Sequence, residues 1–357
     1  MAETDTKSVL RLVKAHQHRC LCWRPAVASA LLFLLAACST LFQPAAVKPV
    51  QLHIKPYASA NQNNRIRFIV LHYTAGDFAR SLQVLTQKSD NPVSSHYLIP
   101  ESFDASYGDK KLQVYQLVAE SERAWHAGES AFEDRQNLND QSIGIELVNR
   151  GHCVSQTEPE TETAQQKLTE NQPAEQHTKQ TTTQNTEQQR TAIQRVAATQ
   201  LCLTPDFDPV QMQLLALLLK DILKRYPDIS PTRILAHSDI APAKKQDPGA
   251  RFPWQWLAQQ GIGAWYDEKT VQLYYRQPVL HHNIRLLQQA LKLYGYAIEV
   301  TGEHDAQSQL YLAAFQRHFV PEQISGQPDD KSVAVLSALL AKYRAAEFQL
   351  LLRQELR

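Results

Sequence analysis

The stretch Phe68-Ile-Val-Leu-His72-Tyr-Thr-Ala75 begins as a short apolar run rich in β-forming residues and ends in polar side chains. Such a run is typical of a buried strand. A second stretch, Leu235-Ala-His237-Ser-Asp-Ile-Ala-Pro-Ala-Lys-Lys245-Gln-Asp247-Pro-Gly, also places a histidine directly after an apolar run, and it adds an aspartate. Two imidazoles and one carboxylate are the ligand count of a catalytic zinc site, which leaves its fourth position to water.

Strand and helix patterns alternate through the first two thirds of the chain. Apolar strand patterns cover residues 65–71, 96–99, 112–118, 143–148 and 234–236, and helical spacing covers residues 77–86 and 209–225. Asp208 is the expected N-cap of the second helix. The alternation predicts an α/β domain with a central mixed sheet flanked by helices. His72, Glu146 and His237 fall at strand ends, where open α/β sheets bind their ligands.

The length of 357 residues suits one large domain followed by a small one. We expect a linker at 263–280, a small three-helix domain at 281–345 and a C-terminal tail at 346–357. The small domain contains a repeat, in which Val300-Thr-Gly302-Glu-His-Asp305-Ala-Gln-Ser308 matches Ile324-Ser-Gly326-Gln-Pro-Asp329-Asp-Lys-Ser332. Each copy has a turn glycine and an aspartate able to begin a helix.

The charge balance argues against one class of partner. The chain has 37 basic and 36 acidic residues, so it lacks the basic excess typical of nucleic-acid-binding proteins. We therefore expect no nucleic-acid partner.

Residues 1–37 have the features of a targeting segment. Basic residues precede an apolar run that is too short to span a bilayer and ends in small residues before Cys38. This pattern resembles a bacterial lipobox, which implies a lipoprotein signal peptide, lipidation of Cys38 and, because Ser39 follows, retention on the periplasmic face of the outer membrane. An ordinary secretory signal or a short anchor helix is the alternative. Residues 38–55 contain prolines that would keep a tether extended.

A polar insertion at about 153–202 interrupts the α/β domain. Glutamine, threonine and glutamate dominate it, and it contains neither aromatic residues nor glycine. Such a segment cannot bury enough apolar surface to offset its ordering entropy, so we expect it to be mobile. Cys153 and Cys202 flank it and are the two cysteines that remain beyond Cys38. An even remainder in an oxidising compartment predicts one disulfide, with two unpaired thiols as the alternative.

Five stretches resemble, in order, the type-2 amidase family, the zinc N-acetylmuramoyl-L-alanine amidases. They are Ile69-Val-Leu-His72-Tyr-Thr-Ala75, Ser94-Ser-His96-Tyr-Leu-Ile99, Ala124-Trp125-His126-Ala-Gly128, Ser142-Ile-Gly-Ile-Glu146-Leu-Val-Asn149, and His237-Ser-Asp-Ile-Ala-Pro242 through Lys245 and Asp247-Pro-Gly249. The resemblance covers roughly residues 56–262 apart from the insertion. Residues 281–345 resemble a helical peptidoglycan-binding domain, and the lipidated layout resembles the outer-membrane lipoprotein amidases of enterobacteria.

By position, the resemblance implies that His72, His237 and Asp247 hold one Zn²⁺ ion. Two imidazoles favour zinc over magnesium. The family's catalytic acid falls on Glu146 and its conserved lysine on Lys245. Zinc would lower the pKa of water, Glu146 would pass a proton to the leaving amine, and Lys245 would face the developing oxyanion. The alternatives are a surface ion pair for Glu146 and plain solvation for Lys245.

His96, Trp125 and His126 are candidates for the substrate-binding wall, with simple packing as the alternative. The resemblance implies an enzyme that hydrolyses the amide bond between N-acetylmuramic acid, or its anhydro form, and L-alanine in peptidoglycan and muropeptides. The rival from another class is a non-catalytic peptidoglycan-binding lipoprotein that anchors the wall to the outer membrane. The presence of Asp247 argues against it, because recognition-only relatives commonly lose a zinc ligand. An L,D- or D,D-peptidase would need a different ligand pattern.

Overall fold

The computed structural model divides the chain into two compact units, residues 1–61 and residues 62–357. It describes residues 52–155, 200–276, 280 and 283–355. In the first unit the described residues 52–61 are exposed and contain neither helix nor strand. The predicted signal peptide and the lipidation site at Cys38 lie outside the described residues, as does most of the predicted tether. Among the described helices, none has the length and apolar character needed to cross a membrane.

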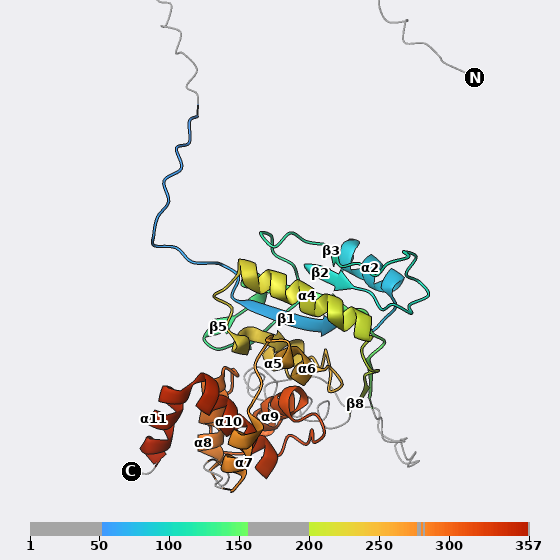
Figure 1. Cartoon of the computed structure of the whole chain (residues 1–357). Coiled ribbons are helices and arrows are strands. Elements are labelled where there is room, and N and C mark those ends of the chain that lie inside the picture. Colours follow the sequence, from blue (N-terminus) through green and yellow to red (C-terminus); the bar gives the residue numbers. More distant parts are fainter. Residues whose placement is uncertain (1–51, 156–199, 277–279, 281–282, 356–357) are drawn as a thin grey trace, which may run out of the picture. The chain divides into compact units, whose positions relative to one another are not determined.

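The larger unit is built on a five-stranded sheet (Figure 1). Its strands, in the spatial order β3-β2-β6-β1-β9, are β3 (Tyr115–Gln116), β2 (Tyr97–Ile99), β6 (Ser142–Leu147), β1 (Phe68–Tyr73) and β9 (Ile234–Ala236). Four strands run parallel and β3 runs antiparallel to β2, which confirms the predicted mixed sheet. The strand expected at 112–118 is shorter in the structure. Near its expected start, the Gln113 N–H donates to the Tyr107 hydroxyl, which donates to the Lys111 carbonyl.

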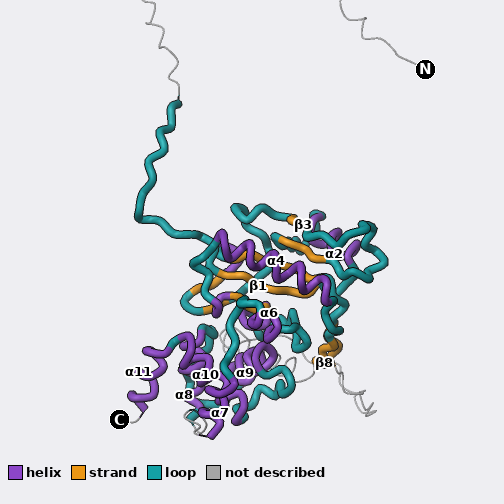
Figure 2. The backbone as a smooth tube through the Cα atoms, viewed as in Figure 1, coloured by secondary structure: helices purple, strands orange, loops and turns teal. Residues whose placement is uncertain are grey.

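Apolar side chains alternate between the two faces of β1, and so both faces of the sheet are covered. Ile69 and Leu71 share a core with α4 (Pro209–Arg225), whereas Phe68 and Val70 share a core with the C-terminal helices. Figure 2 shows the long helix α4 beside the strands and the helical C-terminal part of the chain on their other side. The Asp208 carboxylate accepts a hydrogen bond from the Val210 N–H, which confirms the predicted N-cap.

Shorter elements complete the part of the unit around the sheet. They are α2 (Phe78–Thr86), β4 (Ala131–Phe132), β5 (Arg135–Gln136), β7 (His152–Ser155), β8 (Gln200–Leu203), α5 (His237–Ile240), α6 (Trp254–Gln259) and the 3-10 turns Leu138–Asp140 and Pro231–Arg233. Strands β7 and β8 pair antiparallel with Cys153 opposite Cys202. The insertion therefore lies within a hairpin, and this hairpin belongs to the connection between β6 and α4. Residues 156–199 lie outside the described residues, so the expected mobility stays a prediction. The disulfide also stays a prediction, because the structure describes the backbone of the two cysteines and not their side chains.

The C-terminal part contains more helices than the sequence predicted. They are α7 (Glu268–Arg276), α8 (Ile284–Tyr294), α9 (Ala306–Phe319), α10 (Asp330–Tyr343) and α11 (Ala345–Glu355). The expected linker at 263–280 thus contains a helix, because Val271 is buried where α7 packs against α10. The expected tail contains another, α11, which buries Phe348 and packs against α8 and α10.

The two sequence repeats build the same local structure. Asp305 and Asp329 cap α9 and α10 by accepting hydrogen bonds from backbone N–H groups three residues on, as predicted. In the second copy the buried Gln316 accepts a hydrogen bond from the Gly326 N–H and donates to the Asp329 carboxylate. Gln288 binds the first copy in a similar way, through the Gly302 N–H and the Ser308 hydroxyl.

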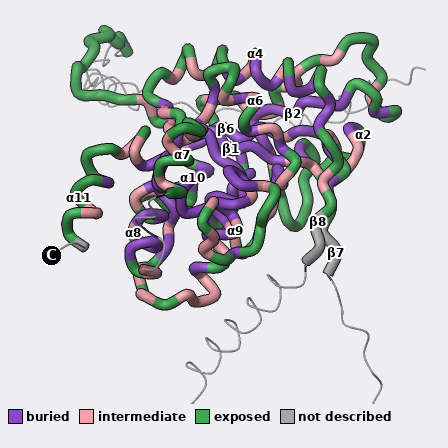
Figure 3. Tube along the Cα trace, turned by 60° about the horizontal axis from the view of Figure 1, so that its bottom comes forward, coloured by how far each residue is buried: buried purple, intermediate pink, exposed green. Residues whose placement is uncertain are grey.

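The C-terminal helices and the sheet share one continuous core. Phe68 and Val70 of β1 belong to the same buried cluster as residues of α8, α9 and α10, and Figure 3 shows buried segments in all these elements. The backbone of Phe132 bridges that of Tyr296, and the Glu133 N–H donates to the Gly295 carbonyl. The helical part is therefore not a separately packed module on a linker.

Candidate metal centre and catalytic cleft

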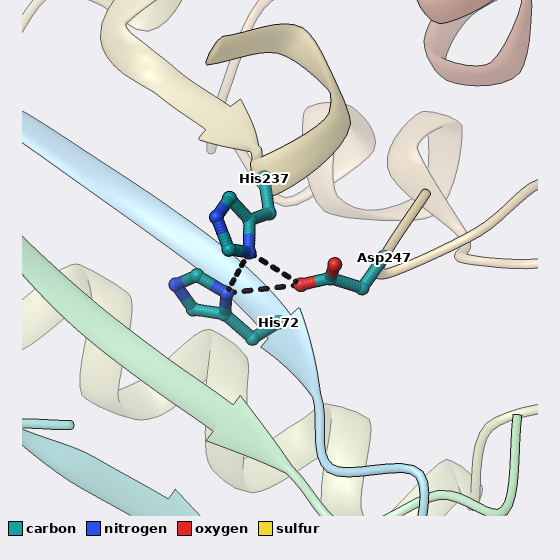
Figure 4. Close-up of side chains that lie close together, drawn as sticks. All are labelled: His72, His237 and Asp247. Carbon is teal, nitrogen blue, oxygen red and sulfur yellow. Dashed lines mark hydrogen bonds and ion pairs between the residues drawn. The ribbon is translucent and has the colours of Figure 1, made fainter. Parts of the chain in front are cut away.

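His72, His237 and Asp247 converge at the carboxyl end of the parallel strands (Figure 4). The Nδ1 atoms of the two histidines are 3.0 Å apart, and the Asp247 Oδ2 lies 2.9 Å from the first and 3.1 Å from the second. All three residues are buried. The structure thus brings together the three residues proposed from the sequence as metal ligands.

Strand periodicity explains why both histidines reach the same place. His72 has the same parity in β1 as Val70, which faces the C-terminal helices. His237 has the same parity as Leu235, which also faces the C-terminal helices. His237 is the first residue of α5, directly after β9. Because β1 and β9 are paired in parallel, the two side chains leave the sheet on one face and at one edge.

The geometry of this group fits a small divalent metal ion. Zinc bonds of about 2.0–2.1 Å in a tetrahedral site place ligand atoms about 3.3 Å apart, slightly more than the separations found between the three residues here. The Nε2 atom of His237 lies 3.3 Å from the Ala127 carbonyl and donates to it. The neutral ring then carries its lone pair on Nδ1, the atom turned toward the other two residues.

A chain of hydrogen bonds sets the tautomer of His72 in the same way. The Ser142 hydroxyl donates to the Leu138 carbonyl over 2.6 Å, so its oxygen accepts from His126 Nε2–H at 3.1 Å. The Nδ1 atom of His126 is then an acceptor, and His72 Nε2–H donates to it over 3.1 Å. His72 is left with its lone pair on Nδ1, again the atom directed at Asp247.

The electrostatics of the group favour the protonation states that bind a metal. Burial, followed by the neighbouring His237, lowers the pKa of His72 to about 4, so this imidazole is neutral near neutral pH. Burial alone would raise the pKa of Asp247, but the charge and hydrogen bonds of His237 and His72 hold it well below its usual range. A neutral imidazole and an ionised carboxylate are the forms that coordinate metal ions.

A cleft of about 630 Å³ opens over these three residues. Its wall includes Thr74, Arg80, Trp125, Glu146, Lys244 and Lys245. The Oε2 atom of Glu146 is buried and has no hydrogen-bond partner among the described residues, which speaks against the surface ion pair considered from the sequence. Burial raises the pKa of Glu146 to about 8, with a further increase from Asp247 and an opposing effect of Lys245. A carboxyl group with such a pKa can exchange protons near neutral pH.

Lys245 and its neighbour Lys244 differ in their contacts. Lys244 pairs with the Glu129 carboxylate on the surface. No ion pair joins Lys245 to any residue that the structure describes, and its charge lowers the pKa of both His72 and Glu146. The charge of Lys245 therefore acts on His72 and Glu146, where the reaction is expected. The catalytic role of Lys245 stays a prediction.

The three candidates for substrate binding have different surroundings. Trp125 is 50% exposed and lines the cleft, so it is available to a ligand. His96 is fully buried and does not belong to the cleft wall. Its Nδ1 accepts from the Gly144 N–H and its Nε2 donates to the Glu122 carbonyl, so the structure corrects its expected role in favour of packing.

His126 reaches the cleft but uses both ring nitrogens to support His72. Neither this support nor the part of Ser142 in it was predicted from the sequence. One signal was present in the sequence, because Gly144 makes room for the ring. A Cβ atom at Gly144 would lie 2.3 Å from the His126 Cγ atom.

Comparisons with known proteins agree with this geometry. The family model described as N-acetylmuramoyl-L-alanine amidase matches residues 62–250. The N-acetylmuramoyl-L-alanine amidase AmiD of Escherichia coli is 40% identical over 281 residues, which cover 78% of this chain and 84% of that protein.

Two solved structures have the same fold. AmpDh3 from Pseudomonas aeruginosa, in complex with anhydromuramic pentapeptide, has a TM-score of 0.65 at 36% identity and covers 82% of this chain and 99% of its own. AmiD from E. coli, in complex with anhydro-N-acetylmuramic acid-L-Ala-D-gamma-Glu-L-Lys, has a TM-score of 0.59 at 37% identity, with coverages of 80% and 93%. The family match covers the site of two histidines, an aspartate and a partly buried glutamate. The chain therefore belongs to the N-acetylmuramoyl-L-alanine amidases and is a hydrolase.

Proposed function

We propose that this chain is a zinc-dependent amidase that cleaves the bond between the lactyl group of N-acetylmuramic acid, or of its anhydro form, and L-alanine. The observation that carries the proposal is the group formed by His72, His237 and Asp247, with the Glu146 carboxyl on the neighbouring strand. A centre of three protein ligands leaves room for water or substrate, as a catalytic zinc site requires.

The chain's own residues supply the proton transfers. Zn²⁺, held by the two histidines and Asp247, would supply Lewis acidity at the scissile carbonyl. Glu146 would take a proton from the attacking water and deliver it to the leaving amine of L-alanine. The ammonium group of Lys245 would stabilise the negative charge that develops on the carbonyl oxygen. The exposed indole of Trp125 would provide an apolar wall for the sugar or the peptide stem.

Muropeptides with an anhydro sugar and intact peptidoglycan are both proposed as substrates. The solved relatives hold anhydromuramyl peptides, and those ligands have the sugar–peptide junction that this reaction requires. The open cleft is large enough for such a junction and does not enclose it. Binding of peptidoglycan by residues 281–345 stays a prediction from their sequence.

The lipid anchor at Cys38 is also part of the proposal, on the strength of the lipobox-like sequence alone. It would hold the enzyme on the periplasmic face of the outer membrane. Labelling with a fatty-acid analogue in cells tests it: the wild-type chain should take up label, and Cys38→Ala should not. Label retained by the variant would contradict lipidation at this residue.

The reaction itself is tested by mass spectrometry of muropeptides. Purified protein is incubated with anhydromuramyl peptides or with sacculi, before and after removal of metal by a chelator, and then with added Zn²⁺. Free stem peptide should form from both substrates, together with the free anhydro sugar from the soluble one and peptide-free glycan from sacculi. The activity should be lost on chelation, and zinc should restore it. Activity that survives complete removal of metal would contradict zinc dependence, and binding of sacculi without cleavage would favour the non-catalytic anchor.

A further inference from the structure

Helix α9 of the C-terminal part contacts both segments that carry the proposed metal ligands. Two consecutive residues of this helix make the contacts. His318 reaches α5, which begins with His237, and Arg317 reaches the turn that contains Asp247.

The contact of His318 is a buried hydrogen bond to a carboxylate. Its Nδ1–H donates to Asp239 Oδ2 over 2.7 Å, and both side chains are almost fully buried. The same oxygen accepts from the Ala236 N–H at 2.8 Å, and Asp239 Oδ1 accepts from the Tyr296 hydroxyl at 2.9 Å. Asp239 thereby joins the end of β9, on the N-terminal side of His237, to two residues of the C-terminal part.

Aromatic stacking fixes the ring of His318 in this position. Its ring centroid lies 3.8 Å from that of the Trp254 indole, and the two planes form an angle of 20°. The centroid of the Phe319 ring is 4.0 Å away, at an interplanar angle of 10°. A ring held on both faces and donating to a buried carboxylate has little freedom to move. Such charge-assisted hydrogen bonds are among the stronger ones in proteins.

The contact of Arg317 lies on the other ligand-bearing segment. Its guanidinium donates to Gln246 Oε1 over 3.2 Å, one residue before Asp247. The Asp247 carbonyl in turn accepts from the Ser238 N–H at 3.1 Å, which ties the turn to α5. Arg317 and His318 therefore contact the two sides of one small assembly, which consists of α5 and the 246–247 turn.

We propose that α9 is a positioning element of the metal centre, in which His318 holds α5 and Arg317 holds the turn with Asp247. The C-terminal helices are then part of the hydrolytic site as well as a candidate wall-binding surface. This inference rests on the proposed metal-dependent function. Groups that orient metal ligands typically account for a 10–100-fold difference in metal affinity.

Zinc affinity of the full-length protein, measured by competition with a chromogenic chelator, tests the inference. His318→Phe keeps an aromatic ring between its neighbours but removes the donor to Asp239, whereas His318→Asn keeps a donor. Arg317→Met removes the contact with Gln246. Gln316→Ala is the matched control on the same helix, because its partners lie in the second repeat, away from the metal centre. Thermal unfolding of the metal-free proteins is recorded alongside.

We expect His318→Phe and Arg317→Met to weaken zinc binding roughly 10-fold, His318→Asn to restore part of the loss, and Gln316→Ala to lower the melting temperature with little effect on affinity. Unchanged zinc affinity in both His318→Phe and Arg317→Met would overturn the proposal. A loss of affinity in Gln316→Ala as large as in these variants would also overturn it, and so would equal losses in His318→Phe and His318→Asn. If the wild-type protein binds no zinc, the proposed function fails instead, so the two failures are distinguishable.

Discussion

His72 and Glu146 are direct partners in the parallel pair of β1 and β6. The pairing places the imidazole and the carboxyl on the same face of the sheet, one strand apart. The proposed general base is thus fixed relative to the metal centre by backbone hydrogen bonds rather than by a loop. A position on the strands of the scaffold gives the precision that catalytic groups need.

Glu146→Gln should separate the chemistry from metal binding. The amide keeps the size of the side chain but cannot accept a proton from water, so turnover of an anhydromuramyl peptide should fall roughly 100-fold or more. Zinc affinity should stay close to that of the wild type because Glu146 is not one of the three ligands. Chelator competition and product formation are measured on the same samples. Turnover equal to that of the wild type would remove Glu146 from the mechanism.

The raised pKa of Glu146 predicts that the free energy of unfolding of the metal-free protein depends on pH. Burial raises the pKa of Glu146 to about 8 from an ordinary value of 4.5. Between these values the folded state holds a proton that the unfolded state has lost, so this group's contribution to stability is present at low pH and is lost as pH rises to 8. His72, with its pKa lowered to about 4, has the opposite effect, but only below its ordinary value of 6.5.

Glu146→Gln lacks this titration, so its free energy of unfolding relative to the wild type should increase from pH 6.5 to pH 9, by on the order of 2 kcal/mol. Urea unfolding of both chelated proteins across that range checks the sign. A difference that is constant with pH would show that the Glu146 carboxyl titrates normally in the fold.

Removal of a ligand should abolish the metal site. His237→Ala takes away one of three ligand atoms and should weaken zinc binding by at least 100-fold, measured by chelator competition. His152→Ala is the matched control, because this histidine also lines the cleft but lies outside the group of three. Its zinc affinity should match that of the wild type. Similar affinities in the two variants would place the metal elsewhere.

The local elements of the fold could be predicted from the sequence because their signals are local. The apolar run before His72 gave β1, and the capping residue Asp208 with the spacing behind it gave α4. The alternation of residues along the two strands also agrees with His72 and His237 lying on the same face of the sheet. Their convergence with Asp247 was a hypothesis from the ligand count and the strand ends, and the family resemblance supported it. Spacing along the chain alone does not give distances in space.

The packing of the C-terminal helices could not be predicted in the same way. Helix α7 is short and mostly polar, and its capping residue Asp267 and one buried valine are weak signals. The docking against the sheet depends on contacts between residues far apart in sequence. Glu133, for example, accepts hydrogen bonds from both Arg233 and Arg344. A sequence pattern that marks each helix as amphipathic does not say which partner covers its apolar face.

The hydrogen-bond chain behind His72 predicts an effect at a residue that does not touch the metal site. Ser142→Ala removes the acceptor of His126 Nε2–H, so His126 no longer has to offer Nδ1 to His72. Zinc affinity should fall roughly 10-fold as the orientation and tautomer of His72 are released. Ser337→Ala is the control, since its buried hydroxyl donates to the Val333 carbonyl within α10 and does not join this chain. Equal affinities in the two serine variants would show that the chain has no influence on the metal.

The pairing of Cys153 opposite Cys202 predicts a disulfide at the base of the insertion. Directly opposed residues of an antiparallel pair have Cα atoms about 4.5–5.5 Å apart, within the range that a disulfide spans. Closing a loop of about 50 residues stabilises a protein by about 4 kcal/mol in the chain-entropy model. Replacing both cysteines with serine should therefore lower the melting temperature under oxidising conditions. With a reductant present, wild type and variant should melt alike. Equal melting temperatures without reductant, or free thiols at both positions in the oxidised protein, would contradict the bridge.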